Sequence, residues 1–236
     1  MGQLKDKVVI VTGASSGIGA ATALKLAKEG AIVITSSRNI KGLEETANSI
    51  RKNKGKVMSI KVDVKNESDI KDMISIVKNK FGRIDAIVNN AGVFYTGPID
   101  SFDTNELDET LDINLRGIYL CCKYAAQVMK KQKNGHIINI SSGSGRVARP
   151  ELSAYTASKF GVMGITESLI QELKPYNIKV SALCPGRTNT PMQIQGSKAY
   201  RKKLVQPEQV ADLIAYMLSL GDNANITEVH LRPMQY

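Results

Sequence analysis

The stretch Thr12-Gly13-Ala14-Ser15-Ser16-Gly17-Ile18-Gly19 decides the fold that we expect of this chain. It lies between an apolar run, Val8–Val11, and a helical pattern through Ala20–Glu29. In such a turn Gly13 permits the tight bend, Gly17 lets the backbone approach phosphate groups, and Gly19 lets the helix pack on the strand. The N–H groups and the positive dipole at the start of the helix favour a pyrophosphate. The stretch therefore predicts a dinucleotide site that includes Gly13, Ser15, Ser16, Gly17, Ile18 and Gly19.

Outward from this turn, apolar runs rich in Val and Ile alternate with amphipathic stretches along the whole chain. The runs are Val8–Val11, Ala31–Thr35, Lys56–Val62, Ile84–Val88, His136–Ile140, Ile178–Leu183 and Ile226–Leu231. Strands with little polar alternation are buried on both faces, as in a parallel sheet covered by helices. We expect one α/β domain over residues 1–236, a Rossmann-type doubly wound parallel sheet of about seven strands with helices on both faces. Ligands of such sheets bind beyond the carboxyl ends of the strands.

Composition narrows the class of protein. The 236 residues are 42% hydrophobic and 23% charged, and no apolar run approaches the roughly 20 residues that cross a bilayer. The segment Met1–Lys7 lacks the features of a signal peptide. We therefore expect a cytoplasmic protein with no membrane partner. The net charge is +10, but the lysines are scattered over helix faces with few interleaved aromatic residues, so we expect no nucleic-acid partner.

The cysteines and histidines do not suggest a metal or a disulfide framework. Cys121 and Cys122 are adjacent and Cys184 is distant, which is neither a zinc spacing nor a disulfide pattern, so we expect inert core thiols. The histidines, His136 and His230, are expected on strands without Cys, Asp or Glu at ligand spacing. We therefore expect no metal site.

The end of the second strand predicts the cofactor. Dinucleotide folds that prefer NAD usually carry Asp or Glu there, whereas this chain reads Thr35-Ser36-Ser37-Arg38. Ser37 can donate a hydroxyl, and Arg38 can pair with a 2′-phosphate. This pattern predicts NADP(H). The alternative is that Arg38 is an exposed loop residue.

Two further segments follow strands at the same edge. Asp63-Val64 is placed where a short polar side chain would contact the adenine amino group. Asn90, Ala91 and Gly92 are small enough for the backbone to pass close to the adenosine ribose. Either segment alone is also typical of an ordinary turn.

The segment Tyr155-Thr156-Ala157-Ser158-Lys159 carries the candidate chemistry. In a helix Tyr155 and Lys159 lie on one face, one turn apart. A phenol with a pKa of about 10 is a poor proton shuttle at neutral pH, and a neighbouring ammonium lowers that pKa. We expect Lys159 to lower the pKa of Tyr155, which would act as general acid and base. Such a pair is also common on ordinary helix surfaces.

The motifs together resemble the short-chain dehydrogenase/reductase family over essentially the whole length. They are Thr12–Gly19, Asn89–Gly92, Asn114, Ser142, Tyr155, Lys159 and Pro185-Gly186. The resemblance implies that Ser142, thirteen residues before Tyr155, orients a substrate carbonyl. It also implies that Lys159 holds the nicotinamide ribose and that Asn114 anchors a water. The implied catalytic set is Asn114, Ser142, Tyr155 and Lys159.

The resemblance extends to the segment that would lie under the nicotinamide. Pro185, Gly186, Thr188 and Thr190 correspond to it. The position of Thr188 is often Val or Ile in the family, so its side-chain packing is a departure. For the substrate, Ser142, Ser144, Phe94 and Leu183 are the candidate contacts, and residues 187–206 are expected to form a covering loop.

The activity that the resemblance implies is reversible reduction of a carbonyl to an alcohol with NADPH. The substrate classes that it favours are 3-oxoacyl compounds, 3-hydroxy acids and small ketones. A non-catalytic NADP(H)-binding or sensing protein of the same fold is the main alternative, and a methyltransferase with a similar glycine turn is another. Small residues in the helical stretches Leu111–Lys131 and Ser153–Lys174, which the family pairs between subunits, predict a homotetramer or otherwise a dimer.

Overall fold

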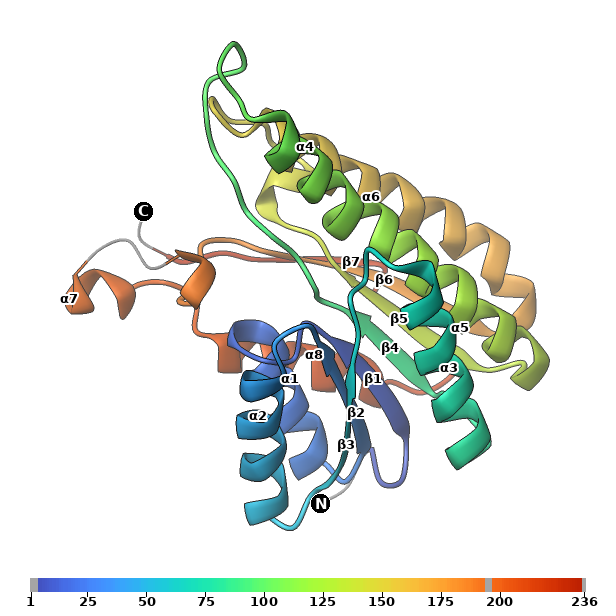
Figure 1. The fold of residues 1–236 in the computed structure, drawn as a ribbon. Helices are drawn as coiled ribbons and strands as arrows, with labels where there is room; N and C mark the ends of the chain where they lie inside the picture. The colour runs from blue at the N-terminus through green and yellow to red at the C-terminus, as the bar shows by residue number, and fades with distance from the viewer. Residues whose placement is uncertain (1–3, 194–196, 235–236) are drawn as a thin grey trace.

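The computed structural model describes residues 4–193 and 197–234, and within them seven parallel strands form one sheet. The strand order is β3-β2-β1-β4-β5-β6-β7 (Figure 1). The first three strands are added towards one edge of the sheet, and β4 to β7 are added towards the other edge, so the strand order reverses between β1 and β4. The strands are β1 (Val8–Thr12), β2 (Ile32–Ser37), β3 (Lys56–Lys61), β4 (Ala86–Asn89), β5 (Gly135–Ile140), β6 (Ile178–Pro185) and β7 (Glu228–Leu231). The expected doubly wound fold is confirmed.

Helices cover both faces of the sheet (Figure 1). On one face lie α1 (Gly17–Lys28), α2 (Ile40–Lys52) and α8 (Pro207–Ser219). On the other lie α3 (Glu67–Phe81), α4 (Thr104–Leu111), α5 (Ile118–Gln132) and α6 (Ser153–Leu173). The short α7 (Lys198–Arg201) stands away from the sheet.

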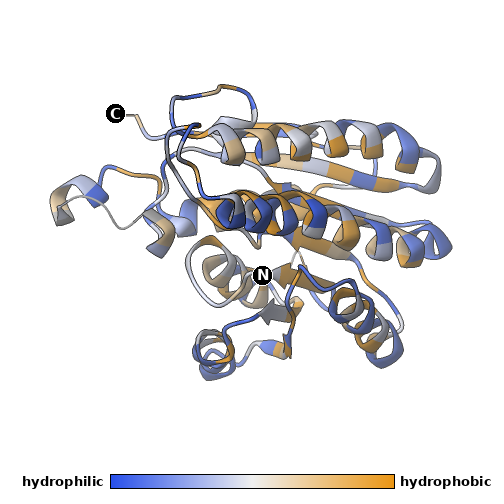
Figure 2. Cartoon of the chain, turned by 45° about the horizontal axis from the view of Figure 1, so that its top comes forward, coloured by the Kyte–Doolittle hydropathy of each residue, from blue (hydrophilic) through white to orange (hydrophobic). Residues whose placement is uncertain are grey.

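Strand β1 shows why the apolar runs lack polar alternation. Val8 and Ile10 belong to the hydrophobic core on the side of α3 and α5, and Val9 and Val11 belong to the core on the side of α1 and α8. Successive side chains of a strand point to opposite faces, so both faces of β1 are buried. In Figure 2 the strands are mainly hydrophobic, whereas the helices carry both hydrophobic and hydrophilic residues.

Two strands begin later than the sequence predicts, because side chains take over backbone bonds at their starts. The N–H of Ile84 donates to the Gln132 side chain at 2.9 Å, and β4 begins at Ala86. At β7, the side chain of Asn225 donates to the carbonyl of Val180 on β6 at 2.9 Å, and pairing begins at Glu228.

None of the helices in the described ranges is long and apolar enough to cross a membrane. The three cysteines, Cys121, Cys122 and Cys184, are buried and unbridged, as expected. Burial raises the pKa of Cys122 to about 12 and that of Cys184 to about 11. These raised values disfavour the reactive thiolate.

A further buried titratable group is His136, near the start of β5 and 7% exposed. Its Nε2 shares a hydrogen bond of 2.8 Å with the hydroxyl of Ser181, which in turn bonds to Asn225 at 3.1 Å. Burial, aided by the charge of Lys179, lowers the pKa of His136 from 6.5 to about 3. The folded protein therefore keeps this imidazole neutral.

This neutrality predicts a loss of stability in mild acid. Well above pH 6.5 the imidazole is neutral in both the folded and the unfolded chain. Below pH 6.5 the unfolded chain binds a proton at this imidazole, whereas the folded chain does not bind one until the pH falls to about 3. The free energy of unfolding should fall by about 2 kcal/mol between pH 7 and pH 5 from this group. His136→Gln should flatten this slope in denaturant unfolding curves. His230→Gln, which changes the chain's other, exposed histidine, should keep it; equal slopes in the two variants would contradict the assignment.

Candidate active site

One cleft of about 1120 Å³ lies at the carboxyl ends of the strands, over the point where the strand order reverses. It gathers most of the residues singled out in the sequence. These are Gly13, Ser15, Ser16, Gly17, Ile18, Ser37, Arg38, Val64, Asn90, Ala91, Gly92, Phe94, Ser142, Ser144, Tyr155, Lys159, Pro185, Gly186, Thr188 and Thr190. The sheet therefore brings together segments that are up to 177 residues apart in the chain.

Four expected residues lie beside or behind the cleft. Gly19 packs the glycine turn, since a Cβ there would lie 2.3 Å from the Gly13 carbonyl oxygen. Asp63 accepts a hydrogen bond from the Lys65 N–H at 3.0 Å. Asn114 is fully buried. Leu183 is also fully buried, and it belongs to the hydrophobic core that contains Val9 and Val88. Its expected place in the substrate pocket is therefore wrong, because its side chain packs in the core beside the sheet.

The glycine turn has the shape that a dinucleotide phosphate requires. Gly13 and Gly17 have φ angles of +65° and +54°, and a Cβ on Gly13 would lie 2.8 Å from the Cα of Ala91. Among the described residues, no side chain caps the start of α1, although Ser16 occupies the N-cap position. The first N–H groups of α1 remain available to an anion at the cleft. These features fit a nicotinamide dinucleotide.

Hydrogen bonds in both directions join the turn after β1 to the turn after β4, where the strand order reverses. The Thr12 hydroxyl accepts from the N–H groups of Asn90 and Ala91, each at 3.0 Å. The Asn90 side chain donates to the carbonyls of Thr12 at 3.0 Å and Gly13 at 3.3 Å. Thr12 has no role of its own among the residues expected from the sequence; the available signal is its polar side chain at the end of a buried strand.

At the other end of the cleft, Ser37 ends β2 and Arg38 follows it, as expected. The Ser37 hydroxyl donates to that of Ser15 at 3.0 Å, which ties the end of β2 to the glycine turn. The Arg38 side chain is 48% exposed, but its Nη1 donates to Glu109 at 3.3 Å and lies 3.9 Å from a carboxylate oxygen of Asp63. The sequence shows no acid beside Arg38, whereas the fold supplies one from α4.

Ser142, Tyr155 and Lys159 meet at the wall of the cleft. Ser142 follows β5 and accepts from the Ser144 N–H at 3.1 Å. Tyr155 lies in the first turn of α6, and Lys159 lies one turn later, with its Nζ 5.6 Å from the Tyr155 ring centroid. The ring of Phe94 packs edge-on against that of Tyr155, with centroids 4.8 Å apart.

The electrostatics of this pair correct one expectation. Burial raises the pKa of Tyr155, and hydrogen bonding to Ser142 only partly opposes this rise. Lys159 donates to the carbonyl of Ile140 at 3.0 Å, and burial lowers its pKa to about 8. The expected lowering of the Tyr155 pKa by Lys159 is therefore wrong, because desolvation of the phenol is the larger effect.

Asn114 supports this wall from behind. It lies in a wide helical turn, Asp112–Gly117, that joins α4 to α5, where the sequence predicts regular helix. Its side-chain oxygen accepts from the Val93 N–H at 2.8 Å, and its nitrogen donates to the Val93 carbonyl at 2.9 Å and to the Ser158 hydroxyl at 3.4 Å. Asn114 thereby links the turn after β4 to Ser158, a residue of α6 that lies between Tyr155 and Lys159 in the sequence.

The segment after β6 closes the remaining side of the cleft. Thr190 lies over the glycine turn, since a Cβ on Gly17 would meet its methyl group at 3.1 Å. Thr188 stands where the family often has Val or Ile. Its hydroxyl donates a hydrogen bond to the Gly186 carbonyl at 3.0 Å, so the polar group has a partner within the segment. Of the expected covering loop 187–206, residues 194–196 lie outside the described residues; Met192, Tyr200 and Leu204 from it line the cleft.

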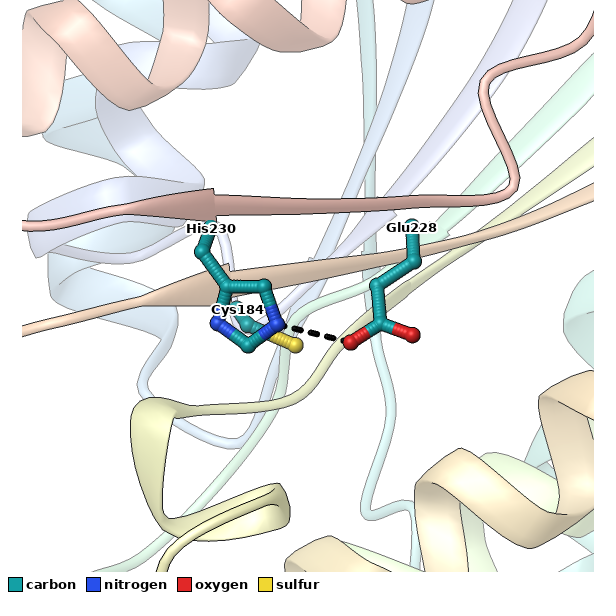
Figure 3. A group of neighbouring side chains, drawn as sticks. All are labelled: Cys184, Glu228 and His230. Carbon is teal, nitrogen blue, oxygen red and sulfur yellow. Dashed lines mark hydrogen bonds and ion pairs between the residues drawn. The ribbon is translucent and has the colours of Figure 1, made fainter.

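A second group of side chains lies on the neighbouring strands β6 and β7. Cys184 and His230 are register partners, and Glu228 lies two residues before His230 on the same face (Figure 3). The expectation that neither histidine has a Cys or Glu at ligand spacing is therefore wrong for His230. Both Glu228 oxygens accept from Arg146, at 3.0 and 2.6 Å, and its pKa falls to about 2. This ion pair ties the turn after Ser142 to β7.

Comparison with known proteins agrees with the fold and the site. Residues 7–201 match the family model described as short chain dehydrogenase. A protein of Staphylococcus epidermidis, described as an uncharacterized oxidoreductase, is 36% identical over 234 residues, which cover 99% of this chain and 100% of that protein. The chain belongs to the short-chain dehydrogenase family, which is a family of oxidoreductases.

Solved structures show the same architecture over the full length. A metagenomic short-chain oxidoreductase in complex with NADP superposes with a TM-score of 0.88 at 34% identity, covering 99% of this chain and 100% of that one. Actinorhodin polyketide ketoreductase with NADPH superposes with a TM-score of 0.89 at 29% identity, covering 96% of this chain and 95% of that one. The family expected from the sequence motifs is confirmed.

Proposed function

We propose that this protein is an NADP(H)-dependent oxidoreductase that reversibly reduces a carbonyl group to an alcohol, with Tyr155 as the general acid and base. The observation that carries the proposal is one cleft with Ser142, Tyr155 and Lys159 on its wall and Arg38 at its far end. The NADP and NADPH complexes of the two solved relatives support this cofactor. A merely sensing protein has no use for the three converging polar groups.

The residues that would hold the cofactor are spread along the cleft. The glycine turn and the start of α1 would bind the pyrophosphate, and Ser37 and Arg38 the 2′-phosphate. Val64, Asn90, Ala91 and Gly92 would border the adenosine, with Asp63 beside them. Lys159, Tyr155 and the segment Pro185–Thr190 would border the nicotinamide ribose and ring. When bound, NADPH supplies the hydride that reduces the carbonyl carbon.

The protein's part is to hold the carbonyl and supply a proton. The Ser142 hydroxyl would donate to the carbonyl oxygen, and the Tyr155 hydroxyl would give that oxygen its proton. The raised pKa of Tyr155 keeps the phenol protonated at neutral pH, which suits the reducing direction. In the oxidising direction the phenolate must accept a proton from the alcohol, so that direction should be favoured by alkaline pH.

The substrate would lie between the Tyr155 hydroxyl and the segment 187–206, which we propose as a covering loop. Phe94, Ser144, Val147 and Met192 line this part of the cleft, a mixture of apolar and small polar side chains. It suits a 3-oxoacyl compound, a 3-hydroxy acid or a small ketone. The name of the actinorhodin polyketide ketoreductase agrees with a ketone substrate.

We further propose that the whole chain acts as one domain in the cytoplasm and assembles as a homotetramer or, failing that, a dimer. Helices α5 and α6 expose Tyr119 by 56% and Phe160 by 44%. Exposed aromatic side chains on neighbouring helices are typical of a surface that packs against a second copy.

Tyr155→Phe should abolish turnover while leaving the cofactor site intact. Loss of a positioned proton donor should lower kcat by about 10² to 10⁴-fold, whereas the ring contact with Phe94 persists and NADPH affinity should stay within a few-fold. The measurement is NADPH absorbance with a panel of carbonyl compounds, beside a cofactor titration. Near-full turnover by this variant would refute the mechanism. Tight NADPH binding without turnover of any carbonyl by the unaltered protein would favour the sensing alternative.

Arg38→Ala tests the cofactor preference. Loss of the guanidinium should weaken NADPH binding by about 1.5 kcal/mol, the lower end for a charged hydrogen bond, because this side chain is half-exposed and already paired. NADH affinity should be nearly unchanged. Isothermal calorimetry with both cofactors is the measurement, and equal affinities for NADPH and NADH in the unaltered protein would contradict the preference.

The assembly is tested by light scattering at micromolar concentration. We expect about four times the 25.7 kDa chain mass, or twice that mass for a dimer. Charged substitutions at Tyr119 and Phe160 should reduce the assembly. A monomer mass for the unaltered protein would show that these helix faces do not pair.

A further inference from the structure

Arg38, the residue proposed to read the 2′-phosphate, is already engaged by an acid from another part of the chain. Its Nη1 donates to Glu109 Oε1 at 3.3 Å. Glu109 belongs to α4, 71 residues later, and its side chain is 27% exposed, less than that of Arg38. Asp63 approaches the same guanidinium nitrogen at 3.9 Å. The positive charge of Arg38 is therefore shared before any anion arrives.

Glu109 is held in this position by a second partner. The hydroxyl of Tyr95 donates to Glu109 Oε2 at 2.7 Å, so both carboxylate oxygens are hydrogen-bonded. The bond from Tyr95, and next that from Arg38, lower the pKa of Glu109, and the carboxylate raises the pKa of Tyr95 in return. Glu109 is thus a fixed negative charge at neutral pH.

We propose that Glu109 is a specificity-determining residue that limits the preference for NADPH over NADH. This inference rests on the proposed use of NADP(H). A 2′-phosphate must share Arg38 with the Glu109 carboxylate and experience its repulsion, whereas the uncharged 2′-hydroxyl of NADH experiences neither effect. The carboxylate that usually favours NAD lies at the end of β2; here an acid reaches the neighbouring residue from α4, which the local sequence does not reveal.

The test is Glu109→Gln, which removes the charge and keeps the size of the side chain. NADPH and adenosine 2′,5′-bisphosphate should each bind about 3- to 5-fold more tightly, while NADH and 5′-AMP change by less than about 2-fold. The readout is the dissociation constant from calorimetry at low ionic strength, so turnover is not required. The gain should shrink at high salt, because the charges are partly exposed.

Two controls separate this effect from a general change in charge. Glu106→Gln makes the same change in net charge on α4, and should alter NADPH affinity by less than about 2-fold. In the Arg38→Ala background, Glu109→Gln should lose most of its effect, since the two residues act on the phosphate as a pair. A gain that is undiminished without Arg38, or that is equal for NADH, would overturn the proposal.

The remaining outcomes also decide the question. Weaker NADPH binding by Glu109→Gln would show that the carboxylate orients Arg38, and unchanged binding would show that it has no effect on the phosphate; either result would overturn the proposal. If the unaltered protein binds NADPH and NADH equally but Glu109→Gln selectively tightens NADPH, the inference stands and the proposed preference fails. If Arg38→Ala leaves NADPH affinity unchanged and Glu109→Gln has no effect, both fail.

Discussion

The hydroxyl of Thr12 accepts hydrogen bonds from two successive N–H groups, those of Asn90 and Ala91, and the rest of the site depends on this contact. It joins the turns after β1 and β4, where the strand order reverses and the crossover helices leave on opposite faces of the sheet. Only small residues permit the turns to lie so close: a Cβ on Gly13 would lie 2.8 Å from the Cα of Ala91. A cleft forms at this junction because the connections that leave the two strands run to opposite sides of the sheet.

Burial sets the chemistry at one end of that cleft. Desolvation raises the pKa of Tyr155 and lowers that of Lys159 to about 8, so each of these groups is pushed towards its neutral form. Their positions come from the two segments that flank them. Ile140 at the end of β5 receives the Lys159 ammonium, and Asn114 fixes the turn after β4 to α6. At the other end Arg38 is half-exposed, and its guanidinium lies near two carboxylates, those of Glu109 and Asp63.

The order of strands and helices and much of the cleft could be predicted from the sequence, because those signals are local. A strand buried on both faces must be apolar throughout, as in Val8–Val11, and a turn that meets phosphate needs glycine at fixed spacing. The exact starts of β4 and β7 could not be predicted. At β4 the ladder bond is replaced by Gln132, 48 residues later in the chain, and at β7 the neighbouring Asn225 bonds to Val180, 45 residues earlier on β6.

The sequence by itself determined the doubly wound sheet, the family, and Ser142, Tyr155 and Lys159 as polar residues of one cleft. Tertiary structure decided the properties that depend on surroundings. Leu183 faces the core rather than the cleft, because its direction depends on the register of β6. Glu228 and Cys184 meet His230 only through strand pairing, and Glu109 reaches Arg38 across 71 residues. A pKa or an ion pair depends on neighbours and burial, which no local pattern encodes.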